Sequence, residues 1–307
     1  MTLFPDFEPR RIRTSGTEIN LVVGGDGPAL LLLHGYPQTH VMWHRIAARL
    51  AAHFTVVCAD LRGYGDSGKP VSDPDHAAYS KRAMAQDQVE VMQALGFSRF
   101  AVAGHDRGGR VAHRMARDHP ERIERIAVLD ISPTAIMYGK TDRAFATAYY
   151  HWFFLIQPYD LPERLIGADP DYYLQKKIGG WGSAGLTLFH PAARAEYERC
   201  FRNPATIHAT CEDYRAAASV DLEHDAADAT HKLQCPLLVL WGTNGVVHRL
   251  FDPVADWRQV ARDVRGKALP SGHYLAEEVP DATCAELLGF FRGPHGADAA
   301  PRAGGSD

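Results

Sequence analysis

Hydrophobic residues along the chain gather in short runs that alternate with segments of helical periodicity. Several runs are apolar at every position, as in parallel strands that are buried between two layers of helices. The runs are INLVV, ALLLLH, FTVVCAD, RFAVAGHD, IERIAVLD and CPLLVLWG. The segments between them predict helices at 42–51, 81–95, 107–118, 253–260 and 276–291. This alternation predicts an α/β fold.

The stretch 136–229 interrupts the alternation. It holds no comparable apolar run but many aromatic residues, as in AYYHWFFLIQPY and DYYLQKK. Because connections between elements usually run only a few residues, this stretch predicts an inserted helical unit, a cap. We therefore expect a core of residues 1–135 and 230–293, a cap of residues 136–229, and a flexible Gly/Ala/Pro-rich tail of residues 294–307.

Composition and charge narrow the class of partner. The 307 residues carry a formal net charge of -4, and the 33 Lys and Arg form no long basic run, so we expect no nucleic-acid or membrane partner. The five cysteines show no CxxC spacing, which argues against a disulfide framework or a thiolate zinc site. With no signal-like or membrane-spanning stretch, the chain predicts a cytoplasmic protein that acts on a small molecule.

One stretch has the form of a nucleophile elbow, the sharp strand-to-helix turn that exposes a reactive side chain. It reads Gly104-His105-Asp106-Arg107-Gly108, with glycines at both ends to relieve crowding. A carboxylate such as Asp106 is nucleophilic at neutral pH without a base, but the ester that it forms must then be hydrolysed. This second step requires a histidine to activate water and an acid to orient that histidine.

Candidates for the histidine and the acid follow further along the chain. His273, in LPSGHYLAEEVP, stands in a loop before the last predicted helix, and Asp130, in AVLDISPT, stands at the end of a predicted strand. Asp252 is the alternative acid. Each residue alone is more typical of a surface turn or a helix cap, but their order after the elbow favours a catalytic triad of Asp106, His273 and Asp130.

The segment LLLHGYPQTHVMW resembles the HGxP loop that supplies an oxyanion-hole amide in this architecture. We assign the oxyanion hole to the backbone N–H groups of Tyr36 and Arg107. His34 is expected to be structural, and DLRGYGDSGKP to hold the backbone. His40 and His44 are four residues apart but lack the HExxH pattern, so no metal site is expected.

From about residue 10 to 292 the chain resembles the α/β-hydrolase superfamily, in the branch with an aspartate nucleophile. This resemblance implies a mostly parallel eight-stranded sheet flanked by helices, with an inserted helical cap. The pattern HDRxxR, with Arg107 and Arg110, resembles the fluoroacetate (haloacetate) dehalogenases, in which two arginines bind the substrate carboxylate. The alternative, in which the arginines bind no substrate, is that Arg110 pairs with Asp106 one helical turn away while Arg107 points to solvent.

The same resemblance implies a site for the departing halide. His151 and Trp152, in AYYHWFF, and Tyr214, in CEDYRAA, match the family's halide donors. Without the resemblance, these aromatic residues would be interpreted as packing of a cap helix. Tyr149, Tyr150 and Trp181 are expected to pack or to line the pocket, and the family further implies a homodimer.

These features predict a haloacid dehalogenase that needs neither a metal nor an organic cofactor. An epoxide hydrolase is the alternative enzyme, with Tyr149 or Tyr150 beside Tyr214 as acids, but a neutral epoxide gives the arginines no partner. A receptor for a small anion is the non-enzymatic alternative. It would need no nucleophile, base and acid.

Overall fold

An eight-stranded sheet lies at the centre of the computed structural model, which describes residues 3–293. The strand order is β1-β2-β4-β3-β5-β6-β7-β8. The pairs β1–β2 and β2–β4 are antiparallel and the other neighbours are parallel. The strands are β1 (Glu8–Arg13), β2 (Glu18–Gly24), β3 (Ala29–Leu33), β4 (Thr55–Ala59), β5 (Phe100–His105), β6 (Ile123–Leu129), β7 (Leu237–Gly242) and β8 (Val264–Leu269).

Burial explains which strands the hydrophobic pattern could identify. Every residue of β3 and β5 is buried, and the remaining inner strands are buried at most positions. The two outermost strands, EPRRIR in β1 and VRGKAL in β8, are largely exposed and carry charged residues, as edge strands do to discourage further pairing. Neither has an apolar run, and both were missing from the six strands predicted by the pattern.

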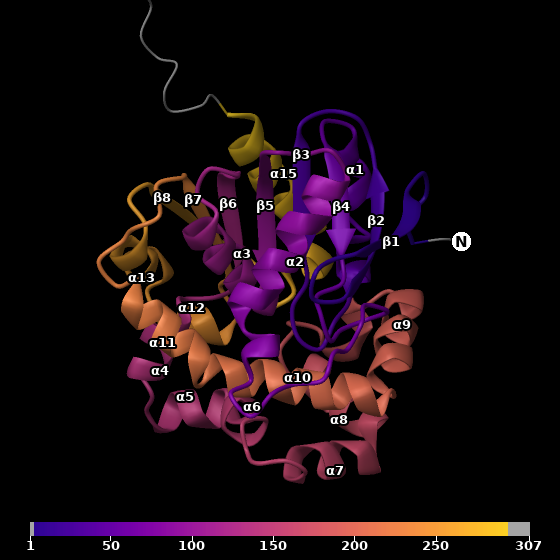
Figure 1. Ribbon diagram of the computed structural model, residues 1–307, viewed down its shortest axis with the longest axis vertical. Coiled ribbons are helices and arrows are strands. Elements are labelled where there is room, and N and C mark those ends of the chain that lie inside the picture. The colour runs from indigo at the N-terminus through magenta and orange to yellow at the C-terminus, as the bar shows by residue number, and fades with distance from the viewer. Residues whose placement is uncertain (1–2, 294–307) are drawn as a thin grey trace, which may run out of the picture.

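Helices cover both faces of the sheet (Figure 1). In Figure 1, α2 and α3 lie in front of the sheet, and α15 lies behind it. These helices and the others that follow a strand of the core are α1 (Ala47–Ala51), α2 (Lys81–Ala94), α3 (Arg107–Asp118), α12 (Val246–Leu250), α13 (Pro253–Val260), α14 (Leu275–Glu278) and α15 (Pro280–Arg292). Within residues 3–293, no helix combines the length and the hydrophobicity that crossing a bilayer requires.

Two of the helices that were predicted to be continuous are each divided into two elements. The helix expected at 42–51 is a 3₁₀ turn, η1 (His40–Trp43), followed after a break by α1. The helix expected at 276–291 is divided between α14 and α15. Pro280 opens α15, and because proline has no backbone N–H and hinders the preceding turn, the two helices cannot run on as one.

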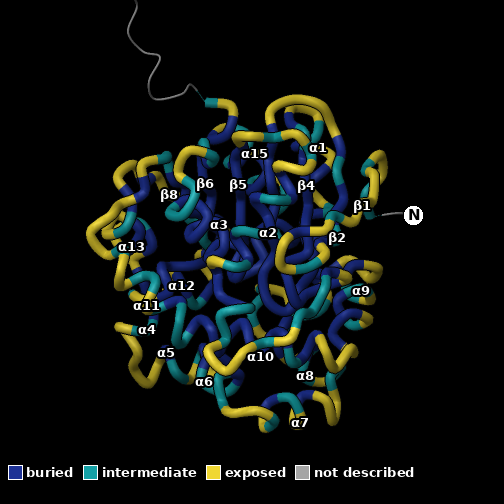
Figure 2. Tube along the Cα trace, viewed as in Figure 1, coloured by how far each residue is buried: buried dark blue, intermediate teal, exposed yellow. Residues whose placement is uncertain are grey.

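A helical insertion, α4 to α11, fills the chain between β6 and β7 and lies across one end of the sheet (Figure 1). Figure 2 shows that the inner strands of the sheet beneath it are buried, whereas much of α7 is exposed. The helices are α4 (Thr134–Gly139), α5 (Arg143–Ala148), α6 (Tyr150–Phe154), α7 (Leu161–Ala168), α8 (Pro170–Gly179), α9 (Pro191–Phe201), α10 (Pro204–Ala217) and α11 (Val220–Ala227). The domain boundaries at 135 and 229 stay predictions, and the expected tail, residues 294–307, lies outside the described residues.

The turn between β5 and α3 holds Asp106 in a backbone conformation with φ 45° and ψ -113°. Such a conformation is strained for a non-glycine residue and persists only where its surroundings fix it. Close packing on both sides fixes it here. A Cβ on Gly104 would lie 2.3 Å from the carbonyl oxygen of Gly108, and a Cβ on Gly108 would lie 2.4 Å from that of Leu33. Both glycines are thus required by space.

We expect Gly108→Ala to lower the free energy of unfolding by about 1–3 kcal/mol, because the added methyl group meets backbone of β3 that cannot move aside. Gly167→Ala is the matched control. Gly167 lies on the exposed helix α7 with no atom within 4 Å of its added Cβ, so the same change should stabilise by about 0.5–1 kcal/mol. Urea unfolding of both variants measures the difference, and equal stabilities would contradict the role given to Gly108.

A buried polar cluster joins the loop after β3 to α14 and to the helical insertion. The amide of Gln38 donates to Glu277 Oε2 over 2.5 Å, and the hydroxyl of Tyr197, on α9, donates to Glu277 Oε1 over 3.1 Å. Burial raises the pKa of Glu277 to about 8, although both hydrogen bonds act in the opposite direction. Glu277 is therefore protonated in the folded protein at neutral pH.

The raised pKa of Glu277 makes stability depend on pH. An unfolded glutamate ionises near pH 4.5, so the contribution of Glu277 is fully present below that pH and is lost as the pH rises towards about 8. Glu277→Gln keeps a neutral hydrogen-bonding group and removes this loss. We expect the Tm of the variant to rise relative to wild type between about pH 5 and pH 8. Parallel melting curves across that range would contradict the shift.

Candidate active site

His273 and Asp130 lie in contact, although they are far apart in the sequence. His273 stands in the loop between β8 and α14, and its Nδ1 is 2.6 Å from Oδ2 of Asp130, at the end of β6. The other carboxylate oxygen of Asp130 accepts the backbone N–H of Gly242 over 3.0 Å. Asp130 therefore fixes the proton on Nδ1 and leaves Nε2 of His273 as the basic nitrogen. The alternative acid, Asp252, instead caps α13 by accepting from Ala255.

Asp106 is 6% exposed, and the loop that follows β3 contacts its carboxylate. The backbone N–H of Tyr36 donates to Oδ2 of Asp106 over 3.0 Å. Arg107, whose backbone N–H is the other group predicted to form the oxyanion hole, is the first residue of α3 and directly follows Asp106. Burial alone would raise the pKa of Asp106, but the electrostatic effects of nearby His273 and Arg110 outweigh it and lower the pKa. Asp106 is thus an ionised carboxylate at neutral pH.

His105, which sequence reasoning passed over, supports the loop of His273. Its Nε2 is 2.8 Å from the carbonyl oxygen of His273, so this nitrogen carries the proton and donates. Burial lowers the pKa of His105 to about 3, and the ring is neutral. The ring centroids of the two histidines are 4.4 Å apart. His105 therefore links β5, the strand that precedes Asp106, to the loop of His273.

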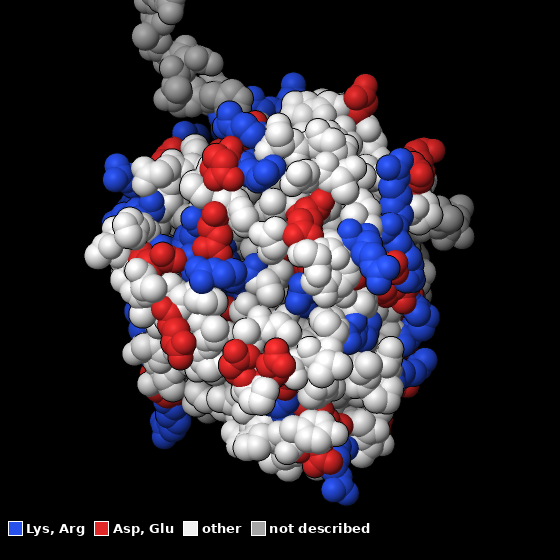
Figure 3. Space-filling view, in the orientation of Figure 1, with Lys and Arg blue, Asp and Glu red and all other residues white. Residues whose placement is uncertain are grey.

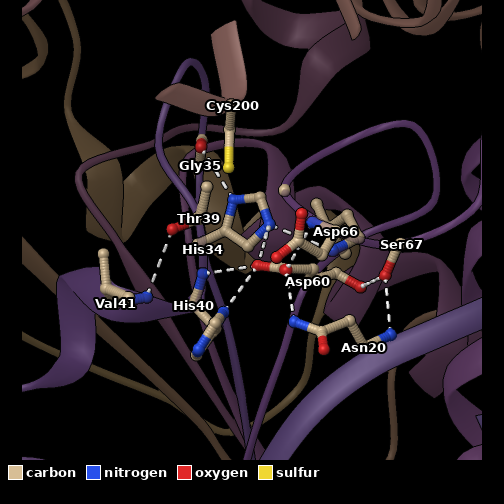
Figure 4. Close-up of polar contacts among 12 residues, drawn as sticks. Asn20, His34, Gly35, Thr39, His40, Val41, Asp60, Asp66, Ser67 and Cys200 are labelled. Carbon is tan, nitrogen blue, oxygen red and sulfur yellow. Dashed lines mark hydrogen bonds and ion pairs between the residues drawn. The ribbon is translucent and has the colours of Figure 1, made fainter. Parts of the chain in front are cut away.

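A second polar cluster, around Asp60, holds the loop after β3 (Figure 4). Asp60 accepts the backbone N–H and Nδ1–H of His40, the amide of Asn20 and the backbone N–H of Asp66. Nε2 of His34 accepts the backbone N–H that follows Asp60. These bonds match the supporting role expected for His34 and its partner loop. Within the described chain, no three His, Cys, Asp or Glu side chains gather closely enough to hold a metal ion.

Arg107 is fully buried, and the suggestion that it points to solvent is wrong. Its Nε and Nη2 donate to the two carboxylate oxygens of Asp213, on α10, over 2.8 and 2.6 Å. Lys81 and the hydroxyl of Tyr64 bind the same carboxylate. The Nε and Nη2 edge, through which an arginine can bind a carboxylate with two hydrogen bonds, is thus occupied by Asp213. Only Nη1 of Arg107 has no partner among the described residues. Sequence reasoning missed Asp213.

Arg110 is held by groups that carry no charge. Its Nη1 donates to Oγ1 of Thr134 over 2.8 Å and to the carbonyl oxygen of Ser132 over 3.2 Å, while Nη2 lies 3.2 Å from the sulfur of Met137. No ion pair joins it to Asp106 within the described chain, so the alternative of a simple helix-turn pair is wrong. Nε of Arg110 is buried without a hydrogen-bond partner among residues 3–293.

Two further buried donors without a partner in the described chain are Nε1 of Trp152 and the hydroxyl of Tyr214. They lie beside the arginines. The guanidinium carbon of Arg107 is 4.1 Å from the ring centre of Tyr214, and that of Arg110 is 4.8 Å from the ring centre of Trp152. The structure therefore brings together, next to Asp106, most of the residues that the sequence assigned to substrate and halide.

His151 completes this cluster. It is buried, its ring stacks on that of Tyr36 at 6.1 Å, and the ring of Tyr214 is 5.6 Å away. The ring of Trp181, which was expected to pack or to line the pocket, has its centre 5.3 Å from that of His151 and 5.1 Å from that of His273. Nδ1 of His151 contacts Lys177, a residue that sequence reasoning did not single out.

Several known proteins are similar to this chain in sequence and in structure. A protein called fluoroacetate dehalogenase, from Burkholderia sp, is 50% identical over 289 residues, 94% of this chain and 95% of its own. A soluble epoxide hydrolase from Corynebacterium sp. (strain C12) is 35% identical over 90% of this chain and 94% of its own. The crystal structure of ALR0039 from Nostoc sp PCC 7120 superposes with a TM-score of 0.92, at 60% identity, covering 93% of this chain and 98% of that one. Residues 28–284 match the sequence model of the alpha/beta hydrolase fold, and the chain belongs to that family.

Proposed function

We propose that the protein is a hydrolytic dehalogenase that converts fluoroacetate and related haloacetates to glycolate and halide. The 50% identical relative that is named fluoroacetate dehalogenase supports this substrate class. The epoxide hydrolase relative is more distant, at 35% identity. The proposed roles of the individual residues rest on the geometry of the site.

In the first step, a carboxylate oxygen of Asp106 attacks the carbon that bears the halogen. A C–O bond forms, the carbon–halogen bond breaks, and the halide leaves with the electron pair. We assign its solvation to N–H and O–H donors of His151, Trp152 and Tyr214, which replace the water that a small anion loses on entering a buried site. An ester of Asp106 remains.

In the second step, water hydrolyses that ester. Nε2 of His273 takes a proton from the water, which attacks the carbonyl carbon of the ester, while Asp130 stabilises the resulting imidazolium. The oxyanion is placed to accept from the backbone N–H groups of Tyr36 and Arg107. The N–H of Tyr36 already donates to Asp106, so this donor is aimed before the reaction begins. The imidazolium returns its proton to the oxygen of glycolate as the bond from that oxygen to the carbonyl carbon breaks. Glycolate leaves, and the Asp106 carboxyl ionises again without a cofactor.

The observation that carries the proposal is a set of buried donors that have no partner within residues 3–293. They are Arg107 Nη1, Arg110 Nε, Trp152 Nε1 and Tyr214 Oη. A buried donor left unsatisfied costs about 1–3 kcal/mol, and more where the group is charged, so four together are costly unless water or a ligand binds them. An anion with a carboxylate at one end and a halogen at the other matches this set.

The donors also define how the carboxylate is bound. Because Asp213 occupies Nε and Nη2 of Arg107, the substrate is left with Nη1 of that residue and Nε of Arg110. Each arginine therefore contributes one unpaired nitrogen: Nη1 of Arg107, which carries two N–H groups, and Nε of Arg110, which carries one. Two side chains together bind the substrate carboxylate, and this orients the α-carbon of the substrate towards Asp106.

An epoxide hydrolase is supported less well. Tyr214 and Tyr149 are buried near Asp106, as an acid pair would be, but Tyr150 is 47% exposed. A neutral epoxide would leave the free N–H groups of both arginines unpaired. A small-anion receptor would use the arginines but has no need of the contact between His273 and Asp130.

We further propose that the enzyme acts in the cytoplasm as a homodimer. All five cysteines are free thiols, in keeping with a reducing compartment. The exposed apolar residues Tyr159, Leu161 and Leu165, on and next to α7, supply surface for association of two copies. On the face shown in Figure 3, basic and acidic side chains are interspersed, which supports a small-molecule substrate rather than a nucleic acid.

Purified enzyme is expected to release fluoride from fluoroacetate and chloride from chloroacetate, and to hydrolyse styrene oxide slowly or not at all. An ion-selective electrode and chromatography of the diol measure the two activities. Rapid hydrolysis of the epoxide without halide release would favour the epoxide hydrolase. Binding of haloacetate with turnover of neither substrate would favour the receptor.

Two variants test the covalent route in the same assay. Asp106→Asn, checked by mass spectrometry for deamidation, should release no halide. His273→Asn should complete the first step only, so that intact-protein mass spectrometry finds one carboxymethyl ester per active site. Halide release by this variant without such an adduct would contradict the ester intermediate.

Arg110→Gln should lower kcat/KM for chloroacetate by about ten- to a hundredfold, since it removes a charged hydrogen bond to the substrate carboxylate. Chloroacetamide provides the control, because it carries the same leaving group without the negative charge. Its kcat/KM should change little. A variant that loses both activities equally would show that Arg110 supports the fold of the site rather than the carboxylate.

A further inference from the structure

A buried lysine contacts the candidate halide site without being part of it. Lys177 lies on α8 and is 4% exposed, and its Nζ is 2.8 Å from Nδ1 of His151. The amine also lies 4.0 Å from the ring centre of Trp181 and 5.6 Å from that of Tyr150. Among residues 3–293, Lys177 makes no ion pair with a carboxylate, and His151 is its hydrogen-bond partner.

The contact with Lys177 decides which nitrogen of His151 carries the proton. A neutral imidazole has one N–H and one acceptor nitrogen, and burial together with the nearby cations lowers the pKa of His151 well below its ordinary value. If Lys177 donates, Nδ1 is the acceptor and the N–H is on Nε2. Were Nδ1 protonated instead, Nε2 would present a lone pair, which repels an anion.

Lys177 can donate to His151 in either of its protonation states. An ammonium has donors and no acceptor, and a neutral amine still has two N–H groups, so donation to Nδ1 is open to Lys177 in either state. Nε2 of His151 has no hydrogen-bond partner in the described chain. Asp106, Arg107, Arg110 and His273 are the charged or titratable groups that act on this pair.

We propose that Lys177 is a positioning residue: it donates to Nδ1 of His151 and so keeps the ring N–H on Nε2, directed at the departing halide. The proposal rests on the proposed dehalogenase function and adds to it a residue that acts on the leaving group through His151. It also explains why an amine lies buried without a carboxylate partner. The requirement is strictest for fluoride, which concentrates its charge on a small atom and is a poor leaving group.

Lys177→Met tests this role, since methionine fills similar space without an N–H donor. The kcat for fluoroacetate should fall by about tenfold, that for chloroacetate by about twofold or less, and KM should change little, because the lost interaction matters as the halide departs. Lys176→Met is the matched control. Lys176 is the neighbouring residue on α8 and is exposed, so both activities should stay as in wild type.

The tautomer of His151 is measured independently of turnover, by ¹⁵N NMR of the histidine rings, with His151→Gln to assign the signals. Wild type should show Nε2–H with Nδ1 unprotonated, and Lys177→Met should lose this preference. Lys177→Arg, whose side chain donates but does not accept, should restore it together with part of the fluoride activity.

The outcomes separate this inference from the proposed function. A wild-type enzyme that releases no halide contradicts the dehalogenase. Active wild type with a proton on Nδ1 of His151 contradicts donation by Lys177. The role is equally overturned if Lys177→Met leaves both the tautomer and the ratio of fluoride to chloride release unchanged.

Discussion

The site depends on keeping charged groups buried, which is tolerated only where each charge is paired or awaits a ligand. Asp106, Arg107 and Arg110 are all buried within the first turns of one helix. Arg107 is neutralised by Asp213, whereas Arg110 is held by a hydroxyl, a carbonyl and a thioether. Together with His273, the unmatched positive charge of Arg110 lowers the pKa of Asp106. Under the proposed function the same charge also attracts the anionic substrate.

Local pattern was enough to locate the parts of the site that lie at strand ends. The elbow around Asp106 and the acid at Asp130 follow from apolar runs, whereas His273 was located by its glycine-containing loop before the last helix and by its order after the elbow. The structure brings all three residues to one end of the sheet. The inner strands were likewise found from their apolar runs. The edge strands β1 and β8 were not, because their exposed faces carry charges where a buried strand has apolar residues.

The residues that contact these side chains from the helical insertion could not be predicted from the local sequence pattern. Asp213 contacts Arg107 across 106 positions of sequence, and its own surroundings in CEDYRAA give no sign of which carboxylate turns inwards. Lys177 follows another lysine on α8, and only packing of the helix determines that one is buried and the other exposed. His151, Trp152 and Tyr214 were assigned through resemblance to a family, since an aromatic run alone is equally typical of a packed helix.

The ion pairs around Asp213 constrain how the helical insertion can move. Arg107 and Lys81 belong to the helices that cover the sheet, whereas Asp213 and Asp221 belong to the helical insertion, and Arg114 and Asp228 make a further such link. A hinged separation of the insertion from the sheet would part several of these buried charges at once, which disfavours it. The helical insertion and the helices of the sheet beneath it are therefore expected to move as one body.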